Sequence, residues 1–221
     1  MRLNQFIASS TGLSRRAADK AIAEGRVRLN DQVAQLGQTV MESDHVSLDN
    51  QRITPAVKST TILLNKPVGY VCSRDGQGSR TVYDLLPASL HHLKPVGRLD
   101  KDSSGLLLMS NDGQLAYKLT HPKFGKDKIY KIALNKPLTP DDQRHISEGI
   151  MLDDGLSKLQ LEQINKSDRT NWKVVIHEGR NRQIRRTFEA LGHNLPKLHR
   201  TMFGPYKLDR LETGKYILTS D

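Results

Sequence analysis

Near residue 27 the spacing of apolar residues changes from helical to strand-like, and that change limits the folds available to the chain. Leu3, Phe6 and Ile7 recur at helical intervals, and Ser14 is placed to cap a second helix that ends at Gly25. The segments that follow mostly alternate apolar and polar residues, as half-covered strands do. The pattern predicts two helices at the start of the chain, then a small sheet, and after it alternating strand-like and helical segments.

The first fifty or so residues predict a small helix-helix-sheet domain. Residues 27–33 alternate apolar and polar side chains around an Asn-Asp turn. Further strand-like runs surround Val40 and Val46. We therefore expect residues 1–53 to fold as two helices followed by a short sheet.

Residues 54–60 are typical of a linker, because proline and small polar residues predominate there. A second domain, residues 61–221, begins with Thr61–Lys66, an apolar run that suits a buried strand. The segments Ile129–Leu134 and Trp172–His177 alternate at period two, as strands of a half-covered sheet do. We expect an α+β chain whose second domain holds a mixed, largely antiparallel sheet.

The charge balance favours an acidic partner. The chain has 34 Lys and Arg against 24 Asp and Glu, which gives a formal charge of +10 and makes nucleic acid the first candidate. A membrane partner would require a long apolar span or a basic amphipathic surface helix, and we find neither. Because the first residues lack the apolar run of a signal peptide, we expect a cytoplasmic protein. The lone Cys72 suits that compartment and is expected to be a small buried hydrophobe.

Basic residues crowd the opening helices, where only Asp19 and Glu24 oppose them. They are Arg15, Arg16, Lys20, Arg26 and Arg28. Charge alone allows a solvated helix surface as readily as an RNA contact. Residues 2–7, 14–18 and 25–30, however, resemble the small RNA-binding domain named after ribosomal protein S-four. The resemblance implies that these five side chains bind RNA.

The segment Gly97–Met109 joins a polar loop to an apolar run that predicts a buried strand. A loop at the edge of a rigid sheet is a common place for a catalytic carboxylate. By spacing alone, Asp100 and Asp102 fit a metal pair, a general acid and base, or a polar turn, and the turn is favoured. Ser103 and Ser104 lie outside any Gly-x-Ser-x-Gly elbow, so we set aside a serine nucleophile.

Residues 178–192 predict a basic amphipathic helix that starts after Gly179. At 100° per residue, Arg185 lies at the margin of the apolar stripe and is the arginine best placed to enter a pocket. Arg182 and Arg186 point away from the stripe, toward phosphates, and the helix start adds free N–H donors for an anion. The alternative is a solvated basic helix.

Four motifs occur in the order seen in the RsuA-type bacterial ribosomal RNA pseudouridine synthases. They are Lys66-Pro67-Val68-Gly69, the segment from Gly97 through Asp112-Gly113, Lys128-Ile129-Tyr130, and the run from Gly179 to Arg186. The resemblance spans nearly the whole chain. It implies a monomeric enzyme that isomerises a uridine in ribosomal RNA, free or in a pre-ribosomal particle, with the large subunit preferred and the small subunit next.

The resemblance also assigns residues. It implies that Asp100 is the catalytic aspartate, that Tyr130 packs on the target base, and that Arg185 pairs with Asp100. Many relatives have Thr at the position of Ser103, and both residues offer a hydroxyl. Further RNA contacts are expected at basic side chains of the second domain. These are Lys66, Arg98, Lys123, Lys126, Lys128, Arg180, Arg182 and Arg186.

The chemistry explains why such residues are required. Pseudouridine forms when the bond from ribose to the ring nitrogen breaks, the uracil turns, and a ring carbon joins the sugar. Nothing is oxidised, so we expect no cofactor and no metal, and the sequence shows no metal-ligand cluster or dinucleotide-binding glycine pattern. An arginine partner would favour the charged form of Asp100 in a dry pocket. Extruding the base from folded RNA costs a few kcal/mol, which phosphate contacts offset.

Two other classes of function remain open at this point. A non-catalytic RNA-binding or ribosome-assembly protein would share the composition, although a pure binder has no need for a carboxylate facing RNA. A metal-dependent nuclease built on Asp100 and Asp102 would need further ligands, and Asp112 is the one obvious third carboxylate.

Overall fold

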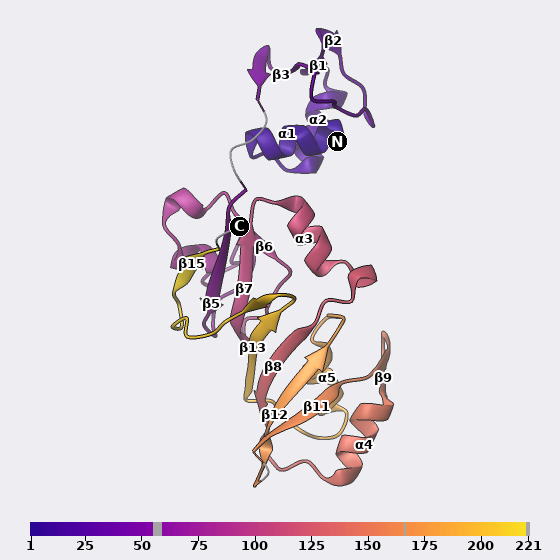
Figure 1. The fold of residues 1–221 in the computed structure, drawn as a ribbon, viewed down its shortest axis with the longest axis vertical. Helices are drawn as coiled ribbons and strands as arrows, with labels where there is room; N and C mark the ends of the chain where they lie inside the picture. Colours follow the sequence, from indigo (N-terminus) through magenta and orange to yellow (C-terminus); the bar gives the residue numbers. More distant parts are fainter. Residues whose placement is uncertain (55–58, 166, 220–221) are drawn as a thin grey trace. The chain divides into compact units, whose positions relative to one another are not determined.

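The computed structural model describes residues 1–54, 59–165 and 167–219. The chain divides into two compact units, Met1–Thr60 and Thr61–Asp221 (Figure 1). Most of the linker expected at 54–60 falls on 55–58, which lie outside the described residues. No helix in the described ranges is long and apolar enough to cross a membrane.

The first unit joins two helices and a four-stranded antiparallel sheet around one apolar core. The sheet order is β2-β1-β3-β4. The elements are α1 (Leu3–Thr11), α2 (Arg15–Ala23), β1 (Val27–Leu29), β2 (Gln32–Val33), β3 (Val46–Leu48) and β4 (Gln51–Ile53). This confirms the predicted helix-helix-sheet arrangement.

Local chemistry explains the helix boundaries. Gly12 ends α1 with φ at +77°, a left-handed conformation that favours glycine. The Ser14 hydroxyl accepts the Ala17 N–H at 3.0 Å and so caps α2. The strand expected around Val40 is wrong. Val40 is a core residue whose N–H donates to Met1, and only its neighbour Thr39 forms an isolated bridge.

The second unit is built on one mixed sheet, in which the main path runs β11-β12-β8-β13-β7-β5-β15. Among the described strand pairs, β13 and β7 run parallel and the others antiparallel, which confirms the predicted mixed, largely antiparallel sheet. The strands are β5 (Thr61–Lys66), β6 (Lys94–Val96), β7 (Ser104–Ser110), β8 (Lys128–Ala133), β11 (Gln160–Asn165), β12 (Asp168–Ile176), β13 (Lys197–Phe203), β14 (Tyr206–Lys207) and β15 (Tyr216–Leu218).

Helices cover both faces of this sheet. Leu107 and Met109 of β7 share a core with α4 and α5, whereas Leu106 and Leu108 share one with α3. The run Leu106–Met109 is therefore buried on both sides, as its unbroken apolar sequence predicts. The remaining elements are α3 (Gly113–Thr120), α4 (Pro140–Glu148), α5 (Gln183–Glu189), the hairpin β9 (Ile150–Leu152) and β10 (Gly155–Ser157), and the 3-10 helices η1 (Val82–Leu85), η2 (Ala88–Leu90) and η3 (Pro122–Phe124).

Gly105 allows β7 and β13 to approach closely at the point where the polar loop enters the sheet. Its φ is +104°, and a Cβ placed there would lie 2.2 Å from the carbonyl oxygen of Arg200, its partner on β13. No side chain fits such a gap. The glycine thus fixes the distance between the loop before β7 and the strand that carries Arg200.

We predict that Gly105→Ala lowers the free energy of unfolding of the second unit by about 2–4 kcal/mol, because it adds backbone strain and a backbone clash. Urea unfolding followed by the fluorescence of Trp172, the single tryptophan, measures this. Gly113→Ala is the matched control, since it starts α3 with open space around a Cβ, and it should change stability by less than about 1 kcal/mol. Equal effects of the two substitutions would show that the close approach is unimportant.

Candidate active site

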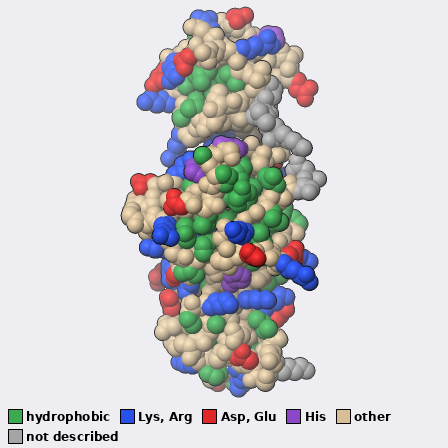
Figure 2. Space-filling model, turned by 90° about the vertical axis from the view of Figure 1, so that its left-hand side faces the viewer, with side chains coloured by type: hydrophobic (Ala, Val, Ile, Leu, Met, Phe, Trp, Pro, Cys, Tyr) green, Lys and Arg blue, Asp and Glu red, His purple; other side chains and the backbone are tan. Residues whose placement is uncertain are grey.

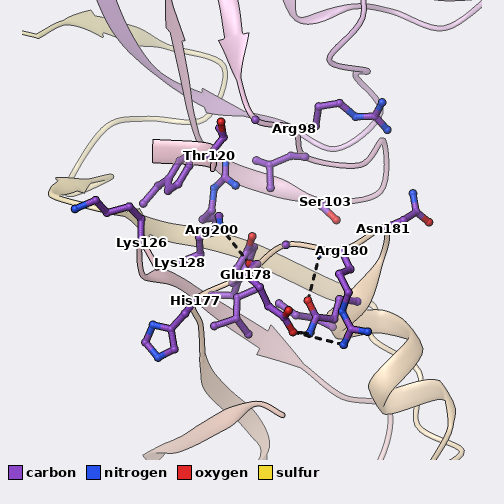
Figure 3. Close-up of a pocket in the computed structure, with 18 of the residues that line it drawn as sticks. Arg98, Ser103, Thr120, Lys126, Lys128, His177, Glu178, Arg180, Asn181 and Arg200 are labelled. Atoms are coloured by element: carbon purple, nitrogen blue, oxygen red, sulfur yellow. Dashed lines mark hydrogen bonds and ion pairs between the residues drawn. The ribbon is translucent and has the colours of Figure 1, made fainter. Parts of the chain in front are cut away.

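A cavity of about 580 Å³ opens in the second unit, a size typical of small-molecule and cofactor sites (Figure 3). Its walls are the loop before β7, the segment after α3, one face of β8 and β13, and the turn into α5. Asp100 and Tyr130, which lie far apart in the sequence, both line it. The two residues expected to carry the chemistry therefore meet at one cavity.

Asp100 occupies the loop between β6 and β7, and its side chain is 29% exposed. Its Oδ2 lies 3.9 Å from a guanidinium nitrogen of Arg182. The next carboxylate along the chain, Asp102, takes the shorter contacts: it accepts two hydrogen bonds from Arg182 at 3.1 and 3.2 Å. Asp100 is thus left partly exposed to the cavity beside one cation.

The expected pair between Arg185 and Asp100 is wrong. Arg185 of α5 is 6% exposed, and its Nη1 and Nη2 donate to the carbonyl oxygens of Leu195 (2.7 Å) and Asp102 (2.9 Å). Nη2 also reaches the Ser103 hydroxyl at 3.4 Å. The Nε atom lies 3.1 Å from the Asp102 carboxylate without an aligned hydrogen bond, so that contact is an ion pair. Asp102, not Asp100, takes this guanidinium.

Lys66 holds the same loop from the other side. Its side chain is fully buried, and the Nζ donates to the carbonyl oxygens of Pro67 (3.0 Å), Asp100 (3.0 Å) and Ser103 (2.7 Å). These bonds use all three ammonium donors. Burial lowers the pKa of Lys66 below its ordinary value. The expected phosphate contact is therefore wrong, because no part of Lys66 reaches the surface.

Tyr130 lies on the inner face of β8 and is 7% exposed. In register it stands between Val174 of β12 and Arg200 of β13, so all three side chains share that face of the sheet. Tyr130 has neighbouring strands on both sides, β12 and β13, and it contributes to the cavity wall. It is a rigid flat surface beside the loop of Asp100.

The turn into α5 differs from expectation. The helix begins at Gln183, not after Gly179, because Arg182 takes a left-handed conformation with φ at +46°. Arg180 and Arg186 then converge on Asp154, with guanidinium–carboxylate distances of 2.8 and 2.6 Å. The hydrogen bond from Arg186 is the main cause that lowers the pKa of Asp154. These two arginines are already balanced by an acid that the sequence pattern did not reveal.

Other expected RNA contacts lie at the cavity or on exposed surfaces. Arg98, Lys126 and Lys128 line the cavity. Lys123 lies outside its lining, with its ammonium 5.1 and 4.8 Å from the ring centres of Tyr117 and Phe124. On the face drawn in Figure 2, Lys and Arg side chains lie in a band across the second unit, a pattern that favours a polyanion.

The five basic residues expected to bind RNA in the first unit are all exposed. Arg26 forms ion pairs with Asp49 and Glu24, which offset its charge. Arg15 and Arg16 form no ion pair with any residue that the structure describes. No acid in the described structure therefore offsets the charge of these two arginines through an ion pair.

The third carboxylate proposed for a metal site is used elsewhere. Asp112 caps α3, where its Oδ1 accepts the N–H groups of Gln114 (2.7 Å) and Leu115 (3.1 Å). Across the described ranges, no group of three or more His, Cys, Asp or Glu side chains is arranged to hold a metal ion. Asp112 is thus engaged as a helix cap and not as a partner of Asp100 and Asp102.

Comparisons with known proteins identify the family of this chain. A family model described as RNA pseudouridylate synthase matches residues 60–190, and an S4 domain model matches residues 1–46. This chain belongs to the RNA pseudouridylate synthase family. These matches confirm the resemblance to the RsuA-type enzymes that the motifs indicated. They also confirm the resemblance of the first unit to the S-four domain.

Individual relatives align over nearly the whole chain. It is 39% identical to ribosomal large subunit pseudouridine synthase B of Bacillus subtilis, covering 96% of this chain and 89% of that protein. It is 34% identical to ribosomal small subunit pseudouridine synthase A of Haemophilus influenzae, covering 98% and 94%. A crystal structure of a pseudouridylate synthase superposes with a TM-score of 0.72 at 33% identity, covering 100% of this chain and 96% of that one.

We predict that Lys66→Met lowers turnover by about a hundredfold, because the loop that carries Asp100 loses its clamp. It should also cost about 1–3 kcal/mol of stability, since buried carbonyl groups lose their donor. The slope of RNA affinity against salt should stay unchanged, whereas a phosphate contact would lower it. Lys94→Met, at an exposed position of β6, is the control and should leave turnover intact. Full turnover in Lys66→Met would refute the clamp.

Proposed function

We propose that this chain isomerises a specific uridine of ribosomal RNA to pseudouridine, with the large subunit as the preferred source of that RNA. One observation carries the proposal: the partly exposed carboxylate of Asp100 and the ring of Tyr130 line the same cavity. The relatives named above, which include synthases of both ribosomal subunits, support it.

Asp100 is the proposed catalytic residue. The reaction breaks the bond between the ribose and N1 of uracil and forms one between the ribose and C5, while the proton lost from C5 is replaced by one on N1. The atoms balance without any other reactant. A carboxylate next to the sugar and base suits this chemistry. Tyr130 is proposed to keep the detached uracil in the cavity while it turns.

We assign the cation beside Asp100 to Arg182 rather than to Arg185. The guanidinium of Arg182 lies 3.9 Å from the carboxylate and is the cation that offsets its negative charge. Arg185 and Lys66 lie outside the cavity lining, and both bind the backbone of the loop. In this proposal they position Asp100, whereas Arg182 faces the reacting nucleotide. Apolar lining residues such as Leu99 and Ile176 help to keep water away.

RNA affinity is proposed to come from two surfaces. The first unit offers Arg15, Arg16, Lys20 and Arg28. The second unit offers Arg98, Lys126 and Lys128 at the cavity and Lys123 outside its lining, and it also offers Arg180 and Arg186, which Asp154 partly offsets. The net charge of +10 and the S4 domain match support RNA as the partner. We further propose that the chain acts as a monomer in the cytoplasm, on ribosomal RNA or a pre-ribosomal particle, without a cofactor.

We predict that Asp100→Asn abolishes pseudouridine formation in unmodified ribosomal RNA while RNA affinity holds or rises. The amide keeps the shape of the side chain but removes the charge that repels phosphate. Mass-spectrometric mapping of pseudouridine, together with a binding titration, provides both readouts. Asp141→Asn, which removes an exposed carboxylate of α4, is the charge-matched control. Pseudouridine formation by Asp100→Asn at the wild-type rate would overturn the assignment.

We predict that replacing Arg15 and Arg16 by Gln weakens RNA binding and lowers the salt slope by about 0.7–0.9 for each phosphate that the protein no longer neutralises. Arg26→Gln is the matched control, because Asp49 and Glu24 already offset its charge, and it should change the slope much less. The slope is read from titrations of ribosomal RNA at several salt concentrations. An unchanged slope in the double variant would mean that this surface does not bind phosphate.

A further inference from the structure

Arg200 is a buried cation of the cavity wall that the sequence analysis did not assign. It lies on β13, is 2% exposed, and lines the cavity among the residues labelled in Figure 3. Its register partner on β8 is Tyr130. Residues paired in this way on neighbouring strands have Cβ atoms about 4.5–5.5 Å apart. Arg200 is therefore a direct neighbour of the ring proposed to hold the base.

The guanidinium of Arg200 is only partly satisfied by the protein. Its Nε donates to the carbonyl oxygen of Leu106 at 2.8 Å, and its centre lies 4.8 Å from the ring centre of Phe203. Its Nη2 atom is buried and has no hydrogen-bond partner among the described residues. An unpaired donor on a buried charged group is costly and requires an explanation, such as a ligand that completes it.

A second cation, Lys128, lies over the same aromatic ring as Arg200. Lys128 is half-buried, donates to the carbonyl oxygen of Glu178 at 3.1 Å, and lies over the same Phe203 ring at 5.2 Å. Burial is the main cause that lowers the pKa of Lys128, and the charge of Arg200 lowers it further. Two cations that lie over one aromatic ring in a partly dry wall repel each other, and an anion between them would offset that repulsion.

The carboxylates of the cavity do not serve as that anion. Asp100 has Arg182 as its nearest cation, and the side chain of Glu178 binds Arg180 and Gln183. Neither carboxylate forms an ion pair with Arg200 or Lys128 in the described structure. The two cations are thus held beside Tyr130 without a protein anion between them.

We propose that Arg200 and Lys128 form an anion subsite that binds a phosphate of the target nucleotide while its base packs on Tyr130. The proposal rests on the function proposed above and adds a recognition element to the same cavity. Phosphate fits better than a uracil carbonyl, because a neutral acceptor would not offset two positive charges. A guanidinium is also suited to phosphate by its planar fork of donors.

Titration of the full chain with uridine 5′-monophosphate, uridine 3′-monophosphate and uridine tests this directly. In protein labelled with ¹⁵N-arginine, nuclear magnetic resonance reports on the guanidinium of Arg200. We expect at least one monophosphate to shift the Arg200 signals and to bind about ten- to hundredfold more tightly than uridine, as a charge-assisted hydrogen bond would give. Equal binding of uridine and both monophosphates, with unshifted Arg200 signals, would overturn the proposal.

Variants separate phosphate binding from a structural role. Arg200→Met should remove the preference for the monophosphate, whereas Arg200→Lys, which keeps the charge without the fork, should retain part of it. Arg144→Met removes an exposed arginine of α4 and should keep the preference in full. A folded Arg200→Met protein that still prefers the monophosphate would refute the subsite. The titration of the unaltered protein decides the question if that variant does not fold.

Two further measurements distinguish free phosphate from a nucleotide as the source of the anion, and the subsite from the proposed reaction. Inorganic phosphate that shifts Arg200 and competes with the monophosphate supports the subsite. Inorganic phosphate that shifts Arg200 while no nucleotide does would show a free-phosphate site and refute the nucleotide assignment. If monophosphates bind through Arg200 but no pseudouridine forms in ribosomal RNA, the subsite stands and the proposed reaction fails. If pseudouridine forms but no phosphate preference depends on Arg200, the proposed reaction stands and the subsite fails.

Discussion

Two buried cations hold the loop on which this site depends. Lys66 from β5 and Arg185 from α5 reach the backbone of residues 100–103 from different elements, and together they bind the carbonyl oxygens of Asp100, Asp102 and Ser103. Each of these hydrogen bonds is strengthened because its donor is charged and buried. The loop therefore has a fixed backbone, although its carboxylate at position 100 remains partly exposed to the cavity.

Local chemistry made much of the fold predictable from the sequence. Ser14 and Gly12 mark the helix boundaries through their own caps, and the Leu106–Met109 run specifies a strand buried on both faces. The expectation at Val40 failed because that segment is held by single long-range contacts with the first residues, which leave no periodic signal. The start of α5 shifted because Arg182 adopts a left-handed conformation that helical spacing does not indicate.

The motifs brought Asp100 and Tyr130 to one site, but they did not determine side-chain partners. Whether Arg185 meets Asp100 or Asp102 depends on the path of the loop backbone, which spacing does not specify. Lys66 was expected to contact RNA. It is buried instead, which is rare for lysine, and the converging carbonyl groups explain its place. Arg200 follows the buried Leu198 at period two on β13, a signal that could have placed it on the inner face of the sheet.

A crystal structure of the full chain bound to an RNA fragment that contains its target uridine tests this account most directly. The account predicts an extruded uridine whose base lies on Tyr130, with the Asp100 carboxylate within about 3.5 Å of the nucleotide. The loop should keep its conformation, with the bonds from Lys66 and Arg185 intact. A uridine still stacked in the RNA, or a loop that has left Lys66 to bring another residue to the nucleotide, would contradict it.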